Sequence, residues 1–290
     1  MIFIKSRKDN DMNKTEMKPL RMGDLVADVP IIQGGMGVGV SLSGLASAVA
    51  NQGGVGVISA VGIGMNGTNG LKVSRKENIL GLRQELRRAR SLSRGVIGVN
   101  IMVALSDYTD LVDCAVEEGA DILFLGAGLP LKFSRNLSPA HMKKTKTKFV
   151  PIVSSPRAAA LIMKQWQKRF SYLPDGIVVE GPKAGGHLGF KKEELGDKNY
   201  SLEQLVPAVV DMVSRFEKKY NKSIPVIAAG GIYSRADIHR FLNLGARGVQ
   251  MGTRFIATHE CDAHIRFKEA IVNSGSEEVS IIQSPVGLPG

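Results

Sequence analysis

One histidine lies in a glycine-rich segment that suits chemistry. The segment 180–189 follows the apolar run 176–179 and places His187 directly after Gly186. Glycine permits positive φ and lets the backbone approach a bound ligand, and histidine is the side chain whose ordinary pKa lies nearest neutrality. The pattern predicts a reactive imidazole at the mouth of a barrel. Taken alone, it is equally consistent with a glycine-rich turn and a surface histidine.

Two further glycine-containing loops follow apolar runs later in the chain. Gly230 and Gly231 come after 224–229, and Gly252 with Thr253 comes after 248–251. In α/β barrels a phosphate often binds the loops after strands seven and eight, where backbone N–H groups and helix N-termini face the anion. Glycines at both positions favour a phosphate cradle over plain turns.

Small and amide residues end the other apolar runs. They are Gln33 with Gly34 and Gly35, Asn100, Gly126, Ser154 and Glu180. If strand register brings them to one mouth, they suit a flat, polar ring system. Gln33 and Asn100 could each instead satisfy backbone groups at the top of a barrel. Glu180 could orient His187 or bind backbone, and these alternatives remain open.

These side chains need a scaffold in which many strands end at one face. The sequence predicts eight strands, at 29–33, 55–59, 96–103, 121–125, 149–153, 176–179, 224–229 and 248–251. Helical patterns alternate with them, at 76–93, 107–118, 137–144, 157–170, 202–216 and 262–273, with others beginning near 42 and 234. Runs that are apolar throughout are typical of parallel strands buried on both faces. The alternation predicts an α/β protein of the (β/α)8 TIM-barrel class.

The predicted barrel forms one domain over residues 19–290, preceded by a flexible polar arm at 1–18. Ser201 with Gln204 has the form of a capping box, and Ser234 is expected to open the next helix. The segment 62–67 matches the spelling of a dinucleotide fingerprint. It does not open a helix directly, so we interpret it as a chance match.

The formal net charge of +11 is compatible with an anionic ligand, an acidic partner or nucleic acid. No nucleic-acid motif and no zinc-ligand spacing occurs, so we predict neither partner. Much of the positive charge lies in 83–94 and 132–148, which we interpret mostly as solvated faces. Cys114 is expected in the core, and neither it nor Cys261 has the context of a catalytic thiol. No apolar run reaches the length of a membrane span, so we expect a cytoplasmic protein with no membrane partner.

Five motifs occur in order along the chain: QGGM at 33–36, GVNIM at 98–102, AGGHLG at 184–189, IAAGGI at 227–232 and VQMGTRF at 249–255. Together they resemble the nitronate monooxygenase family, formerly called 2-nitropropane dioxygenases. That family shares its FMN-binding barrel with enoyl-acyl-carrier-protein reductases of the FabK type. The resemblance covers about residues 18–290.

The resemblance implies a non-covalent FMN. Its phosphate is expected at Gly230, Gly231, Gly252 and Thr253, and its ring and ribityl chain at Gly34, Gly35, Met36, Asn100, Gly186 and Gln250. His187 matches the active-site histidine of the family. It would act as a base toward a nitroalkane or donate a hydrogen bond to nitronate oxygens.

The implied reaction oxidises an alkyl nitronate with O2 to a carbonyl compound and nitrite. An alternative is an FMN-dependent enoyl-acyl-carrier-protein reductase using NAD(P)H, since an acidic acyl carrier protein would meet the positive charge. A third reading is a flavin-binding or complex-forming subunit without turnover. A homo-oligomer is compatible with each of these.

Overall fold

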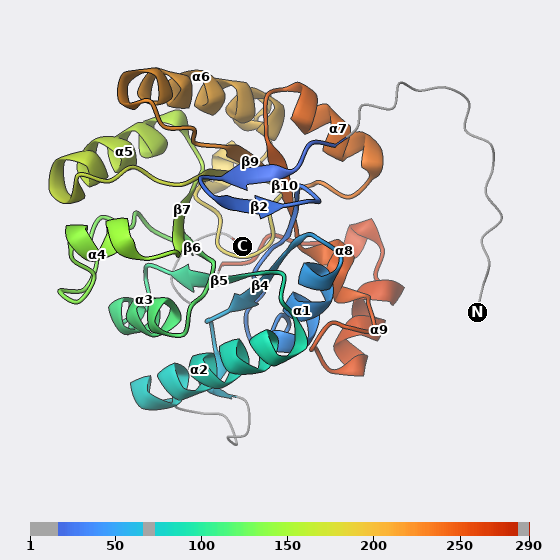
Figure 1. Ribbon diagram of the computed structural model, residues 1–290. Coiled ribbons are helices and arrows are strands. Elements are labelled where there is room, and N and C mark those ends of the chain that lie inside the picture. The colour runs from blue at the N-terminus through green and yellow to red at the C-terminus, as the bar shows by residue number, and fades with distance from the viewer. Residues whose placement is uncertain (1–16, 66–72, 284–289) are drawn as a thin grey trace.

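The chain folds into a closed barrel of parallel strands surrounded by helices (Figure 1). The computed structural model describes residues 17–65, 73–283 and 290. The barrel strands are β3 (Ile31–Gln33), β4 (Val55–Ser59), β5 (Val96–Met102), β6 (Ile122–Gly126), β7 (Lys148–Val153), β8 (Ile177–Glu180), β9 (Val226–Ala229) and β10 (Gly248–Met251). Strand β10 pairs with both β9 and β3 and so closes the barrel. The predicted (β/α)8 class is confirmed.

Helices follow the strands and cover the outside of the barrel. They are α1 (Ser43–Asn51), α2 (Arg75–Leu92), α3 (Tyr108–Glu117), α4 (Pro139–Lys144), α5 (Pro156–Phe170), α6 (Leu202–Tyr220), α7 (Arg235–Asn243), α8 (Thr253–Ile256) and α9 (Ile265–Asn273). Short 3-10 turns are η1 (Ile63–Met65), η2 (Lys192–Glu194), η3 (Lys198–Tyr200) and η4 (Ser276–Glu278). The order matches the predicted alternation of strands and helices.

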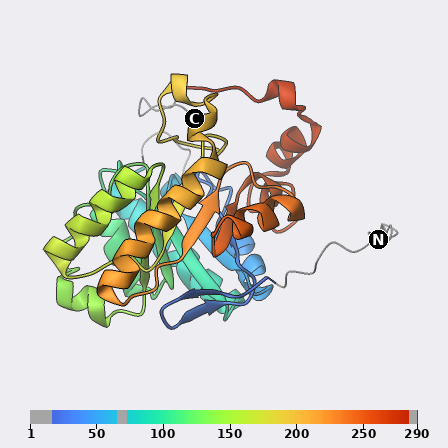
Figure 2. The same ribbon diagram turned by 90° about the horizontal axis from the view of Figure 1, so that it is seen from above.

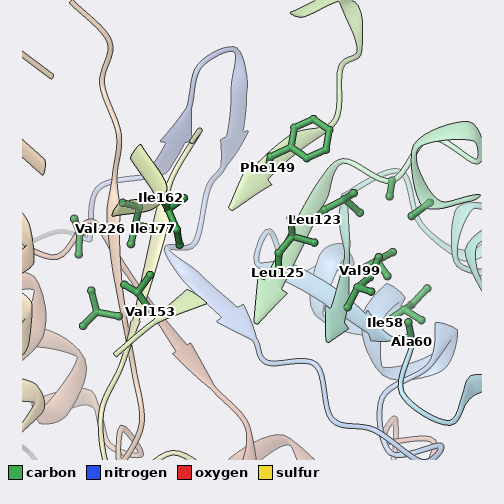
Figure 3. Packing of buried hydrophobic residues seen from close by; sticks show 14 of the residues in the cluster. Ile58, Ala60, Val99, Leu123, Leu125, Phe149, Val153, Ile162, Ile177 and Val226 are labelled. Carbon is green, nitrogen blue, oxygen red and sulfur yellow. The ribbon is translucent and has the colours of Figure 1, made fainter. Parts of the chain in front are cut away.

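Side chains on each strand alternate between two buried layers, because successive residues of a strand point to opposite faces. In β6, Leu123 and Leu125 belong to the outer layer, which also contains Ile162 of α5. Figure 3 shows part of this layer between barrel and helices. Ile122 and Phe124 belong to the inner layer, which fills the barrel. The barrel is therefore a packed core below its mouth.

An antiparallel hairpin closes the lower end of the barrel, where the strands begin (Figure 2). It consists of β1 (Leu20–Met22) and β2 (Leu25–Ala27), which the sequence did not predict. Leu20 and Met22 are buried in the inner layer. Asp24 in the hairpin turn pairs with Lys148 at the start of β7, Oδ1 to Nζ 2.5 Å.

Of two predictions about helix starts, one is wrong and the other is confirmed. Ser201 is the N-cap of α6, but its side chain accepts no hydrogen bond, so the predicted capping box is wrong. The reason is that the carbonyl of Ser201 already accepts from the N–H groups of Gln204 and Leu205. Ser234 does open α7, with its side chain accepting from the N–H of Asp237.

The basic face of α2 is only partly solvated. Arg83 and Arg87 both pair with Glu118 at the end of α3, at 2.9 and 2.7 Å. Because α2 packs beside α3, the two guanidinium groups pair with the carboxylate of Glu118, which is distant from them in sequence. Of the predicted arm at 1–18, only residues 17 and 18 are among the described residues. Of the segment 62–67, which we interpreted as a chance fingerprint match, residues 62–65 are described and 66–67 are not.

Candidate active site

Three polar side chains point into the barrel at its upper end. Their strand neighbours belong to the outer layer: Val99 beside Asn100, Val179 beside Glu180, and Val249 beside Gln250. By alternation Asn100, Glu180 and Gln250 face inward. Gln250 pairs with Ala229, and Ala229 pairs with Glu180, so Glu180, Ala229 and Gln250 form one row across three strands.

The glycines after β3 lie directly against two of these side chains. A methyl group on Gly35 would lie 2.3 Å from Cβ of Asn100, and one on Gly34 would lie 3.3 Å from Cγ of Gln250. Any larger residue at position 35 would therefore displace Asn100 or the loop. Only glycine lets the backbone come this close to the inward side chains.

The side chain of Met36 lies against the loop after β10. A methyl group on Gly252 would lie 3.6 Å from its Sδ. The loop after β3 thus borders the loop after β10, and the structure brings together Gly34, Gly35, Met36, Asn100, Gln250 and Gly252. Gly252 had been expected at the phosphate and the other five around the ring and ribityl chain of the same cofactor.

The loop after β8 runs past the ends of the two neighbouring strands, β9 and β7. The N–H of Gly181 donates to the carbonyl of Ala229 at 2.9 Å, and Gly186 has φ +92°. At the far end of the loop, a methyl group on Gly189 would lie 2.5 Å from Oγ of Ser154, beyond the end of β7. His187 lies within this loop, at the end of the barrel where the strands finish. Its ring is partly exposed, and it has no hydrogen-bond partner among the described residues.

The loops after β9 and β10 present unused backbone donors. Gly230 and Gly231 have φ +105° and +71°, and Lys183 packs against Gly231, where an added methyl would lie 3.0 Å from its Cβ. Gly252 is the N-cap of α8, which has no side-chain cap and whose first residue is Thr253. Among the described residues, the N–H groups of Gly231 and Gly252 have no acceptor. This arrangement can bind an anion.

The amino end of α1 is already closed by carboxylates. Asp262 accepts hydrogen bonds from the N–H groups of Leu42, Gly44 and Leu45, at 2.7 to 3.0 Å. Glu85 accepts from Ser43. An anion at this helix would face two negative charges, so the glycine-rich loop before α1 is not a phosphate site. Sequence reasoning missed Asp262, because it lies about 220 residues beyond the groups it caps.

Gln33 has a structural role. Its side chain is fully buried, and its Oε1 accepts from the N–H of Val57 in β4 at 3.0 Å while its amide donates to the carbonyl of Gly34. It joins β3 to β4, which pair through a single residue couple. Of the two uses considered for Gln33, satisfying backbone groups is confirmed.

Glu180 has neither of the partners considered for it. Among the described residues its carboxyl makes no hydrogen bond and no ion pair, and burial raises its pKa to about 7. Sequence reasoning considered it as a strand-end residue that orients His187 or binds backbone, and did not anticipate a carboxyl without a partner. The available signal was a carboxylate at the last inward position of an apolar strand.

Other parts of the described chain are weaker candidates for the active site. A groove of about 420 Å3 lies between the later halves of α5 and α6, lined by Lys164, Lys168, Arg215 and Lys219 with two aromatic rings. It is far from the strand ends that carry the inward side chains. Within the described ranges no group of three or more His, Cys, Asp or Glu residues is placed to hold a metal ion, and none of the helices there has the length and apolarity to cross a membrane.

The fold is a TIM barrel whose mouth presents unengaged backbone N–H groups after β9 and β10 and a histidine in the loop after β8. The chain belongs to the nitronate monooxygenase family, whose model matches residues 20–122 and 110–289.

Individual relatives have different names. A dehydrogenase of Rhodococcus jostii (strain RHA1), named for (3aS,4S,5R,7aS)-5-hydroxy-7a-methyl-1-oxo-octahydro-1H-indene-4-carboxyl-CoA, is 27% identical over 90% of this chain. The chain spans 61% of the length of that relative. A probable nitronate monooxygenase of Bacillus subtilis (strain 168) is 27% identical, and the match covers 87% of this chain and 72% of the Bacillus protein.

A solved structure gives the same fold. FabK from Thermotoga maritima is similar with a TM-score of 0.68 and 31% identity, covering 90% of this chain and 70% of FabK. The relatives thus share the barrel while their names indicate different substrates.

Proposed function

We propose that the protein is an oxidoreductase that binds FMN at the barrel mouth. The residues fit such a group in two respects. Asn100 and Gln250 pack directly on the backbone of Gly35 and Gly34, so their side-chain amides are available to hydrogen-bond a polar ring at the mouth. A phosphate can be met by the unengaged N–H groups of Gly231 and Gly252.

The residues proposed to hold the cofactor fall into two groups. Those for the phosphate are Gly230, Gly231, Gly252 and Thr253, and those for the ring and ribityl chain are Gly34, Gly35, Met36, Asn100, Gly186 and Gln250. When bound, FMN would supply the electron-transfer chemistry with O2, which no side chain can provide.

The reaction that we favour is the oxidation of an alkyl nitronate with O2 to a carbonyl compound and nitrite. The observation that carries it is His187 itself, which lies in the loop after β8, is partly exposed, and has no hydrogen-bond partner within the described chain. Such an imidazole can accept a proton from the carbon beside a nitro group, or donate a hydrogen bond to nitronate oxygens. Family membership supports the same reaction.

The test begins with the absorbance spectrum of the purified protein. A flavin spectrum, or one restored by adding FMN, is expected. Nitrite release from propane-2-nitronate in air should then be lost in His187→Ala, with the flavin retained. His259→Ala, which changes an exposed histidine, is the matched control. Unchanged nitrite release by His187→Ala would exclude the assigned role.

The second candidate is an enoyl-thioester reductase that uses NAD(P)H. It is favoured by the 31% identity to FabK and by the relative named as a CoA-thioester dehydrogenase. Mixing the flavin-loaded protein with NADH or NADPH under argon separates the two candidates. Rapid bleaching of the flavin would support the reductase, whereas bleaching only by a nitronate would support the monooxygenase.

A further inference from the structure

The groove between α5 and α6 lies on the outside of the barrel, where the two helices run side by side (Figure 1). It has a volume of about 420 Å3 and is lined by residues from the later half of each helix. Each of these helices connects the finish of one strand to the start of the next. The groove therefore lies toward the end where the strands begin, and the FMN site proposed at the mouth does not account for it.

Four cations line the groove. Lys164 and Lys168 of α5 lie one helical turn apart, as do Arg215 and Lys219 of α6. Arg215 pairs with Asp211 at 2.6 Å, whereas the three lysines make no ion pair among the described residues. Like charges at this spacing repel each other on a helix, and the packing of α5 beside α6 brings two such pairs to one groove. A bound anion would relieve this repulsion.

The helix dipoles explain only part of this charge. Cations in the last turn of a helix are favourable beside its free carbonyl groups. Lys168 and Lys219 lie in the last turns of α5 and α6, but Lys164 and Arg215 lie before those turns. The positions of these two in the same groove need another reason, which a ligand with more than one negative charge would supply.

Two aromatic rings form the apolar part of the groove. Phe216 and Tyr220 are half-buried and pack against the outer layer of the core, which restrains them. Their rings are stacked, with centroids 6.3 Å apart and planes inclined by 18°. The Nζ atom of Lys219 lies 5.2 Å from the centroid of the Tyr220 ring. The groove therefore presents positive charge directly beside a pair of restrained rings.

We propose that this groove binds a free nucleotide that carries two or more phosphates. The flat base would pack on Phe216 and Tyr220, since stacking of a base on an aromatic ring is favourable whatever the base. The phosphates would lie among Lys164, Lys168 and Lys219, because ammonium groups bind phosphate oxygens. The volume is within the range of small-molecule sites. An acidic protein segment fits less well, because Asp and Glu side chains would meet the cations but offer nothing flat to the rings.

The experiment is a calorimetric titration with ADP of the flavin-loaded protein, freed of unbound FMN. Wild type should bind ADP, and it should bind adenosine or pyrophosphate at least about tenfold more weakly, because each makes only part of the contacts. Lys164→Gln/Lys168→Gln should bind ADP at least about tenfold more weakly than wild type. The matched control is Lys76→Gln/Arg88→Gln, which removes the same charge from exposed positions of α2 and should leave ADP binding unchanged.

A second variant tests the ring side of the groove. Tyr220→Leu should bind ADP about fivefold or more weakly than wild type, because the base loses a stacking partner. Its affinity for pyrophosphate should not change. If this variant fails to fold, the comparison of ADP with pyrophosphate on wild type still decides whether the base contributes.

Several results would overturn the proposal. Wild type might release no heat with ADP, or Lys164→Gln/Lys168→Gln might bind ADP as wild type does, which would place the nucleotide elsewhere. Equal affinities for ADP and pyrophosphate would reduce the groove to a plain anion patch, and equal weakening by the α2 control would reduce the effect to overall charge. Tighter binding of polyglutamate than of ADP would assign the groove to an acidic protein. The inference is independent of the proposed function, because a protein that binds no flavin can be titrated as purified and the same variants decide.

Discussion

The backbone of Gly35 lies against the side chain of Asn100, so closely that a methyl group on Gly35 would lie 2.3 Å from Cβ of Asn100. The first βα loop and the third barrel strand are thus fitted to each other without room for a side chain. This contact fixes how near a flat ligand can come to the backbone at the mouth.

Replacing Gly35 by alanine should therefore disturb both stability and cofactor binding. Overpacking costs about 1–3 kcal/mol, and displacement of Asn100 should weaken FMN binding. Urea unfolding and flavin titration measure the two effects. Gly196→Ala is the control, since nothing lies within 4 Å of the added methyl there. Equal behaviour of both variants would contradict the fitted contact.

A second prediction concerns the phosphate. Gly231 has φ +71° and Gly245 has φ +100°, so alanine should strain both by about 1–2 kcal/mol. Only Gly231 lies in the loop after β9 that is proposed to hold the phosphate, whereas Gly245 follows α7 and packs on Val210. Gly231→Ala should reduce the preference for FMN over riboflavin, and Gly245→Ala should keep it. Fluorescence titration with both flavins provides the measurement.

The third prediction follows from burial of Glu180. In the folded protein the carboxyl keeps its proton up to about pH 7, whereas in the unfolded chain it loses it near its ordinary pKa of 4.5. Between these values the unfolded state binds fewer protons, so stability falls as the pH rises. Wild type should lose at most about 3.4 kcal/mol relative to Glu180→Gln over this window. Urea unfolding of both proteins across the window would refute this if their stability difference stayed constant.

Asp262 provides a fourth prediction. It accepts from three backbone N–H groups at the start of α1, so Asp262→Ala should cost about 1–3 kcal/mol. The freed donors should then bind an anion, and added sulfate should restore part of the stability of the variant. Glu269→Ala, on the exposed side of α9, should show neither effect. An absent sulfate response would mean that the helix end had reorganised.

The barrel strands were predictable because each is buried on both faces and so reads as an apolar run. The glycines at the strand ends were also predictable, because a positive φ or a close approach of another group to the backbone leaves few other residues possible there. That is why Gly35, Gly231 and His187 could be singled out in advance. Their proposed roles toward FMN and substrate remain predictions.

What could not be predicted depends on contacts between distant segments. Asp262 caps α1 from the far end of the chain, and Glu118 meets Arg83 only because α2 and α3 are neighbours. Ser201 and Gln204 are the right residue types for a capping box, but the N–H of Gln204 donates to the backbone carbonyl of Ser201 and not to its side chain. The β1–β2 hairpin is too short and too mixed in polarity to give a period of its own.

The β1–β2 hairpin covers one end of the barrel. Leu20 and Met22 seal the end where the strands begin, so the sealed end offers no passage to the interior. Under the proposed function, cofactor, substrate and product would all use the opposite end of the barrel, where the strands finish. With FMN bound at that end, substrate and O2 would have to reach it from the solvent side of the mouth.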